Sequence, residues 1–341
     1  MKKRVIKYSL LGLVFMAASI AAGLFIGSVS LPVADVIKIL ISKIPFLGAL
    51  APHDWAGNIE DILLKLRMPR VILGLIVGSS LAVSGVVFQG LLRNPLAEPY
   101  LLGISSGAAL GTAVIILGNL PFYILGVPMI PSAAFLGGLL SMFLVYGLAR
   151  TKGKIPVHTL LLSGVVINFS FSAVIMLFIT ATNKGLTEIM FWMLGSLNNT
   201  NYELIPFVFI SCATIMFVIY LFSNDLNIIS MGEETAVYLG VETERVKKLM
   251  FILTSLLTGL AVSVSGLIGF VGLIIPHIAR QIVGPDHRTL IPFAALLGAG
   301  FLVLADVLCR TVLSPVEIPI GVVTAILGGP FFLYLLKRKN R

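Results

Sequence analysis

The sequence predicts an all-α integral membrane protein with about ten transmembrane helices and both termini in the cytoplasm. Of its 341 residues, 58% are hydrophobic and 11% are charged, and the mean hydropathy of +1.05 lies well above that of soluble domains. Charge-free runs long enough to cross a bilayer recur along the whole chain, while Lys and Arg gather between them. No sizeable soluble catalytic domain fits in the remaining residues, so we treat residues 1–341 as a single transmembrane domain.

The spans follow from these runs and from the Gly and Pro residues that divide the two longest. The first run follows four basic residues and is too long for a typical signal peptide, so we interpret it as a membrane span. The run 99–149 divides between Gly118 and Pro131, and the run 249–279 divides near Gly266, because Gly and Pro stop helices. The ten predicted spans are 8–29, 70–92, 99–117, 131–149, 157–180, 204–223, 249–266, 269–283, 289–307 and 318–336.

Lys and Arg set the predicted orientation, because cytoplasmic connections retain them. With the N-terminus inside, the inner segments hold 17 of the 24 Lys and Arg residues. The outer segments hold the other seven, which are Lys38, Lys43, Lys65, Arg67, Arg70, Lys184 and Arg310. An even number of spans agrees with this orientation, which places both termini in the cytoplasm.

Several function classes are disfavoured by the residues that carry charge or sulfur. The net charge of +9 is spread between the apolar runs, so the chain lacks the basic patch of a nucleic-acid-binding protein. Cys212 and Cys309 lie in apolar runs, which indicates small core residues rather than a disulfide or a metal site. His277 has no second ligand at metal-binding spacing, so we expect a hydrogen bond near a helix end and no metal site.

The predicted spans place no Asp, Glu, Lys or Arg at mid-depth, where an ion-coupled transporter usually keeps such a residue. We therefore expect a path without charged side chains. Asp306 and Arg310 lie on one helical face at the outer end of a span, which fits either a simple ion pair or a functional pair. The motifs HExxH, GxSxG and GxxxxGK followed by Ser or Thr are absent. We expect no enzymatic activity, and any ATP energy must come from another polypeptide.

The inner connection 225–248 is longer than adjacent spans require. Gly232 and Gly240 predict two short helices, and acidic residues outnumber basic ones. A simple interfacial helix would prefer Lys and Arg near anionic lipid. The pattern therefore favours a surface that docks a protein partner.

The outer segment 30–69 ends in a basic group formed by Lys65, Arg67 and Arg70 at the start of the second span. Basic residues on this side run against the general trend of the chain. They indicate a site for an acidic partner or an anionic solute, with lipid headgroup contact as the alternative.

Several motifs together resemble one known family. They are Leu66-Arg67-Met68-Pro69-Arg70, Arg93-Asn94-Pro95-Leu96-Ala97-Glu98-Pro99, Leu162-Ser163-Gly164-Val165, Met231-Gly232 with Leu239-Gly240-Val241, Gly266-Leu267-Ile268-Gly269-Phe270-Val271-Gly272-Leu273, Pro276-His277-Ile278-Ala279-Arg280 and Pro319-Ile320-Gly321. In these motifs the chain resembles the FecCD-type permeases of bacterial ABC importers, which include the permeases for ferric siderophores, haem and vitamin B12. The resemblance covers essentially the whole chain.

The resemblance implies a type II ABC importer permease, multi-pass, in the cytoplasmic membrane of a bacterium or archaeon. It also implies partners: a second permease copy, most simply as a homodimer, two ABC ATPase subunits that hold ATP-Mg, and an extracytoplasmic substrate-binding protein. The chain itself is expected to lie in the lipid bilayer and to bind no cofactor and no nucleic acid. ATP binding to the partner subunits would drive alternating access of the paired permeases.

Three groups of site residues follow from the resemblance. Docking of the binding protein is assigned to Arg67, Arg70 and Arg310. Coupling to the ATPase is assigned to Leu226, Met231, Gly232, Glu233, Glu234, Ala236, Leu239, Gly240 and Val241. The translocation path or gate is assigned to Gly85, Gln89, Asn94, Pro95, Ser163, Gly164, Asn168, Trp192, Pro276 and His277. For Asn168, an interhelical hydrogen bond is an equal alternative.

The sequence favours an iron chelate of the siderophore type as the substrate, since such permeases are the commonest in the family. Cobalamin, haem and an oxyanion such as molybdate stay open as alternatives. A gradient-driven secondary transporter would need the mid-membrane carboxylate that the spans lack. A receptor or scaffold would use the inner connection for signalling and would need neither ten spans nor the matched path motifs.

Overall fold

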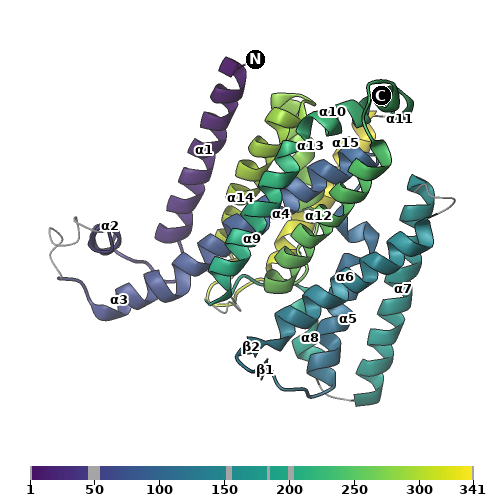
Figure 1. Cartoon of the computed structure of the whole chain (residues 1–341). Helices are drawn as coiled ribbons and strands as arrows, with labels where there is room; N and C mark the ends of the chain where they lie inside the picture. The colour runs from purple at the N-terminus through teal and green to yellow at the C-terminus, as the bar shows by residue number, and fades with distance from the viewer. Residues whose placement is uncertain (1, 45–53, 151–155, 183–184, 199–202, 340–341) are drawn as a thin grey trace.

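The computed structural model describes residues 2–44, 54–150, 156–182, 185–198 and 203–339, and it consists almost entirely of helices (Figure 1). The helices are α1 (Lys2–Phe25), α2 (Val33–Ser42), α3 (Gly57–Asp61), α4 (Met68–Leu91), α5 (Ile104–Leu117), α6 (Met129–Ala149), α7 (Val157–Thr182), α8 (Leu186–Met193), α9 (Leu204–Leu221), α10 (Ser223–Met231), α11 (Glu233–Tyr238), α12 (Thr243–Ser265), α13 (Val271–Val283), α14 (His287–Thr311) and α15 (Ile320–Lys339). A π-helical turn (Ile62–Arg67) joins α3 to α4, and a 3₁₀ turn (Pro99–Leu102) precedes α5.

Each of the ten predicted spans coincides with a helix. In the described part of the chain, seven helices are long and apolar enough to cross a membrane, namely Ile6–Phe25 in α1, the continuous helix Gly57–Leu91, α6, α7, α9, α12 and α14. The three other predicted spans match the shorter apolar helices α5, α13 and the part Ile320–Leu333 of α15. The all-α membrane class is confirmed, and the number of crossings stays a prediction.

Both long charge-free runs divide where Gly and Pro predict it. Between α5 and α6 the chain forms a two-stranded hairpin, in which β1 (Tyr123–Ile124) pairs antiparallel with β2 (Val127–Pro128). Between α12 and α13, residues 266–270 leave the helix, and Gly266 and Phe270 have φ angles of +67° and +68°. A right-handed helix does not continue through this conformation.

The helices pack closely through glycine. Of the most apolar window in Gly57–Leu91, 89% is buried, so α4 lies inside the bundle. At Gly78 and Gly85 a Cβ atom would overlap a backbone carbonyl of α14 and of α13, respectively. At Gly107 a Cβ atom would overlap a backbone carbonyl of α6 in the same way. Small residues thus let neighbouring helices approach backbone to backbone.

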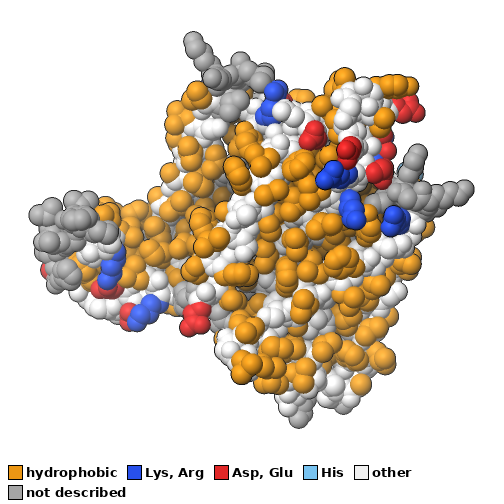
Figure 2. Space-filling view, in the orientation of Figure 1, with side chains coloured by type: hydrophobic (Ala, Val, Ile, Leu, Met, Phe, Trp, Pro, Cys, Tyr) orange, Lys and Arg blue, Asp and Glu red, His pale blue; other side chains and the backbone are white. Residues whose placement is uncertain are grey.

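The two chain ends lie at the same end of the bundle as α10 and α11, and the β1–β2 hairpin lies at the other (Figure 1). We call the end with α10 and α11 the inner end and the opposite one the outer end; their sides in the membrane stay a prediction. Figure 2 shows the face of the molecule that is turned to the viewer in Figure 1. Hydrophobic side chains cover most of this face, and charged side chains lie near the inner end and around α2 and α3. Among the basic residues used for orientation, Lys152, Lys154, Lys184 and Arg341 lie outside the described residues.

The predicted outer segment 30–69 contains α2, α3 and the π-helical turn, and its residues 45–53 lie outside the described part. Its lysines are paired within the segment: Lys38 with Asp54, Lys43 with Glu60 and Lys65 with Asp61, each at 2.7 Å. These pairs lie at the surface and contribute little to stability. The lysines of this segment therefore already have acidic partners in the chain itself.

Candidate functional site

A cavity of about 850 Å³ lies at the outer end of the bundle. Its wall comes from the outer ends of α4, α5, α6, α12 and α14, from the β1–β2 hairpin, from α8, from residues 195–198 and from residues 317–320 at the start of α15. It holds four aromatic side chains, Phe122, Tyr123, Phe191 and Trp192, and the polar residues Ser196, Asn198, Ser263 and Ser265. Its charged residues are Arg70, Glu188, Asp306 and Glu317. We call this space the outer cavity.

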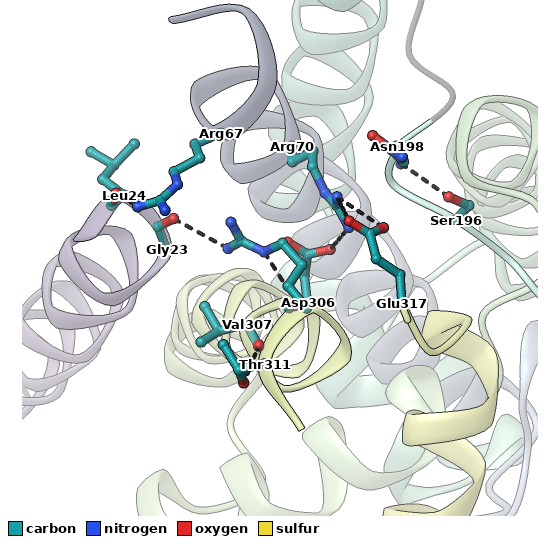
Figure 3. Close-up of polar contacts among 11 residues, drawn as sticks. Gly23, Leu24, Arg67, Arg70, Ser196, Asn198, Asp306, Val307, Thr311 and Glu317 are labelled. Carbon is teal, nitrogen blue, oxygen red and sulfur yellow. Dashed lines mark hydrogen bonds and ion pairs between the residues drawn. The ribbon is translucent and has the colours of Figure 1, made fainter. Parts of the chain in front are cut away.

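An ionic cluster that contains Arg70, Asp306, Arg310 and Glu317 borders the outer cavity. Figure 3 shows Arg70 pointing toward Asp306 and Glu317. Arg70 Nη2 donates to Asp306 Oδ1 at 2.9 Å, and its Nη1 donates to Glu317 Oε1 at 2.9 Å. Arg310 Nε lies 3.0 Å from Asp306 Oδ2, so one carboxylate bridges two guanidinium groups. The predicted pairing of Asp306 with Arg310 is thus confirmed. We call these four residues the outer ionic cluster.

Two arginines also bind the C-terminal end of α1. The last carbonyl groups of a helix have no partner within the helix, and arginine side chains can satisfy them. Arg67 Nη1 donates to Leu24 O at 2.7 Å and to Phe25 O at 3.0 Å. Arg310 Nη2 donates to Gly23 O at 3.2 Å. Arg67 and Arg310 therefore hold the end of α1 against the bundle.

The arginines assigned to binding-protein docking lie beneath the surface. Arg67, Arg70 and Arg310 are 4%, 8% and 3% exposed, and each is hydrogen-bonded within the chain. Glu317 is the most exposed member of the outer ionic cluster, with 41% of its side chain exposed. Docking through these arginines stays a prediction, and it requires that a guanidinium group exchange an internal partner for an external one.

At the inner end, α10 and α11 form the two short helices that Gly232 and Gly240 predict. Gly232 has φ of +138° and Gly240 of +83°, so each ends a helix in a conformation that favours glycine. Lys247 holds the start of α11 through an ion pair, in which its Nζ lies 2.6 Å from Glu233 Oε1.

The residues assigned to ATPase coupling divide into a buried and an exposed set. Leu226 and Ala236 are fully buried in the main hydrophobic core, so they anchor the two helices. Met231 and Leu239 are 71% and 60% exposed, and their neighbour Tyr238 is 90% exposed. Glu234 and Gly240 are exposed as well, while Gly232, Glu233 and Val241 are half-buried. The exposed set forms an apolar surface with acidic residues beside it, and its role in coupling stays a prediction.

A polar junction joins α10 to the start of α14. Asn227 Nδ2 donates to Asp286 Oδ1 at 2.7 Å, and the backbone N–H of His287 donates to Asn227 Oδ1 at 2.8 Å. Asp286 also accepts from the backbone N–H of Arg288 at 3.1 Å and so caps α14. Hydrogen bonding to Arg288, partly opposed by burial and aided by Asn227, lowers the pKa of Asp286 to about 2. We call Asn227, Asp286 and His287 the inner junction.

Of the residues assigned to the path or gate, Trp192 lines the outer cavity. Gly85 packs against α13, and Gly164 packs against the backbone of Leu101. Asn168 Nδ2 donates to Tyr100 O at 3.4 Å. This is the hydrogen bond between helical segments that the sequence offered as the alternative to a role in the path.

The other assigned path residues are dispersed over the bundle. Gln89 accepts from Arg280 at 3.0 Å, and Asn94 and Pro95 lie in the turn after α4. His277 hydrogen-bonds Gln281 at 2.8 Å, but it lies in the middle of α13, so the expected position near a helix end is wrong. Ser163 and Pro276 are buried. The structure therefore does not bring the assigned path residues together at one site, and their roles stay predictions.

Sequence reasoning missed a carboxylate that lies inside the bundle. The sequence gives Glu98, just before the predicted third span, no role of its own, but its Oε1 accepts from Phe270 N at 2.8 Å. Beside it, Tyr100 Oη accepts from Ile268 N at 2.9 Å. These two side chains satisfy backbone groups that the break between α12 and α13 leaves open.

Arg70, Glu188, Asp306 and Glu317 place charged side chains in the wall of the outer cavity, while the expectation of a translocation path without charged side chains stays a prediction. Glu188 and Glu317 come from α8 and from a connection, outside the spans that the expectation considered. In the described part of the chain, no three His, Cys, Asp or Glu side chains come together as a possible metal site.

Comparison with known proteins gives consistent results. The sequence model of the FecCD transport family matches residues 14–338. The cobalamin import system permease protein BtuC of Halobacterium salinarum is 42% identical over 81% of this chain and 73% of its own length. The hemin transport system permease protein HmuU of Yersinia pestis is 41% identical over 84% of this chain and 87% of its own length. A solved ABC transporter described as of the metal-chelate type, in an inward-facing conformation, matches with a TM-score of 0.81 and 30% identity over 98% of this chain and 99% of that one.

Proposed function

The chain belongs to the FecCD transport family and is an ABC importer permease, and we propose that it moves an iron chelate of the siderophore type across the cytoplasmic membrane. The permease is a transport component and not an enzyme. In this proposal, ATP-Mg is bound and hydrolysed by separate ATPase subunits.

The outer cavity is the observation that carries the substrate proposal. Its volume of about 850 Å³ lies in the range of pockets that bind small molecules. Its aromatic side chains suit the organic shell of a chelate, and its Ser, Asn and charged residues suit polar groups on that shell. Relatives named for hemin and for cobalamin support a metal held in a large organic ligand as the general class.

The partners follow from the two ends of the bundle. A substrate-binding protein delivers the chelate at the outer end, where Arg67, Arg70 and Arg310 remain the proposed docking residues. An ATPase subunit docks at the inner end on the exposed apolar surface of α10 and α11. Closure of two ATPase subunits then moves these helices and switches the permeases between outward and inward opening.

A second copy of the chain completes the proposed path. α7 exposes large apolar side chains along its length, including Leu162 and Phe169 at 65% and 74% exposure. Figure 1 places α7 at one side of the bundle, where a second copy or lipid can cover this face. Cysteine pairs along α7 that cross-link two copies in native membranes would support the homodimer, and an absence of cross-links at every position would argue against it.

The test is uptake into proteoliposomes that contain this chain, its ATPase and its binding protein, with ATP on the ATPase side. Ferric siderophore, haem and cobalamin are compared with and without ATP. We expect ATP-dependent accumulation of the ferric siderophore. Accumulation of cobalamin, which the 42% identical relative favours, or of haem instead would change the substrate and keep the class. Accumulation that ignores ATP and follows an imposed ion gradient would overturn the ABC assignment.

A further inference from the structure

We propose that Asn227 is the positioning residue that transmits movement of α10 and α11 to α14 and, along α14, to the outer cavity. The inference rests on the proposed function, because it names the connection between the ATPase-docking surface and the transport site. Three observations carry it: the hydrogen bonds of Asn227, the division of α10 into an anchored and an exposed side, and the course of α14.

Asn227 uses both ends of its side-chain amide on the start of α14. Its Nδ2 donates to Asp286 Oδ1 at 2.7 Å, while its Oδ1 accepts from His287 N at 2.8 Å and lies 2.8 Å from His287 Nδ1. Because an amide oxygen only accepts, Nδ1 of His287 carries the proton in this arrangement. One side chain therefore fixes two successive residues of the chain where α14 begins.

The same junction touches α4. His287 is 3% exposed, and its Nε2 is buried without a hydrogen-bond partner. A Cβ atom at Gly90 would lie 2.7 Å from this Nε2, so the imidazole packs directly on the inner end of α4. α10, α14 and α4 thus meet at one buried imidazole, and Asn227 is its hydrogen-bond partner in the described part of the chain.

α10 also contacts the bundle through apolar side chains. Leu226 and Ile229 are fully buried and belong to the main hydrophobic core. Such contacts hold a helix against its neighbours but are not directional, whereas hydrogen bonds fix its register. The exposed side of α10 and α11, including Met231 and Tyr238, faces away from the core. Among the described contacts between α10 and α14, the hydrogen bonds of Asn227 are directional, so they can pass a force on that side to α14 in a fixed register.

α14 connects this junction with the outer cavity. It is one helix of 25 residues, which corresponds to about 37 Å, with Pro292 inside its second turn. Near its outer end, Asp306 lines the cavity and binds both Arg70 and Arg310. A displacement of the inner end therefore moves the residue that organises the outer ionic cluster.

The test uses the complete complex in proteoliposomes. It exchanges the side-chain amide of Asn227 and the carboxylate of Asp286. Asn227→Asp places two carboxylates in contact at the junction, and Asn227→Asp with Asp286→Asn restores a donor and an acceptor with their positions reversed. The matched control is Asn224→Ala, an exposed asparagine one turn earlier in α10. The readout is the labelling rate of Asn198→Cys in the outer cavity by an impermeant maleimide, with and without ATP and vanadate, in a background with Cys212→Ala and Cys309→Ala.

In the parent and in Asn224→Ala, we expect ATP and vanadate to change the labelling rate. In Asn227→Asp we expect at least a fivefold smaller change, with the ATPase still bound, and in the exchanged pair a return to within about twofold. A full response in Asn227→Asp, an exchanged pair that does not recover, or loss of the ATPase from Asn227→Asp would each overturn the inference. A parent complex whose labelling ignores ATP would instead overturn the proposed function and the inference with it, so the two failures are distinguishable.

Discussion

Asp306→Asn is the substitution that most directly tests how the outer end of the bundle is held together. Asp306 is 2% exposed and bridges Arg70 at 2.9 Å and Arg310 at 3.0 Å. Neutralising this carboxylate leaves two buried guanidinium groups close together with less compensating charge. Breaking a buried ion pair by removing one partner costs about 3–5 kcal/mol.

The chain also supplies the matched control. Glu317→Gln makes the same chemical change at the other carboxylate of the cluster, which binds Arg70 alone and has a 41% exposed side chain. Solvent screens that pair, so its loss costs only about 0–1 kcal/mol. Burial and the number of partners therefore predict clearly different effects for two identical carboxylate-to-amide changes.

The assay is thermal unfolding in detergent, followed with a thiol-reactive dye. Cys212 and Cys309 are both buried, so they react when the bundle opens. At roughly 2 °C per kcal/mol for a chain of this size, we expect the unfolding midpoint of Asp306→Asn to fall by about 6–10 °C. Glu317→Gln should shift it by less than about 2 °C. Equal shifts for the two variants would refute the reasoning that burial of the bridging carboxylate decides stability.

Four further predictions follow from the same structure. Gly85→Ala places a methyl group against a carbonyl of α13 and should cost about 1–3 kcal/mol in the same unfolding assay. Asp286 has its pKa lowered to about 2 from an ordinary value of 3.8, so its stabilising contribution is present above about pH 4 and is lost as the pH falls toward 2. The unfolding midpoint of an Asp286→Asn variant should therefore fall less between pH 4 and pH 2 than the midpoint of the parent. Tyr238→Glu changes a 90% exposed side chain, so it should leave the unfolding midpoint unchanged and reduce co-purification of the ATPase roughly tenfold. If Arg70 docks the binding protein, Glu317→Gln removes its internal competitor and should lower the Kd for that protein by about 1.5- to 5-fold, measured in nanodiscs; a raised Kd would contradict docking through Arg70.

The sequence predicts the helices well because the bilayer restricts the possible structures. A backbone in lipid must satisfy its own hydrogen bonds, so long charge-free runs can only be helices, and Gly and Pro reveal where they break. The break near Gly266 and the two short helices around Gly232 both follow from this reasoning. Local composition is sufficient for such features, since neighbours in the chain determine them.

The polar contacts could not be predicted in the same way. The basic character of Arg67 and Arg70 was visible in the sequence, and it indicated an external acidic partner. Their actual partners are carbonyl groups at the end of α1 and carboxylates 236 and 247 residues further along the chain. Pairings at such separations depend on how the helices assemble. The residue pattern of a single segment therefore cannot predict them.

α14 shows why these polar contacts matter for a protein that must move. Apolar side chains gain little by leaving lipid for another helix, so close glycine contacts and hydrogen bonds carry much of the specificity of helix association in a membrane. α14 makes close glycine contacts, with Gly298 against Gly78 of α4 and Gly300 against Phe15 of α1, and it makes directional contacts at its two ends, with Asn227 and with Arg70. A helix held in this way can shift as a unit along its glycine contacts, while its two polar ends determine which positions are stable. The same polar contacts that order the bundle are therefore the ones through which binding events at either end can select its state.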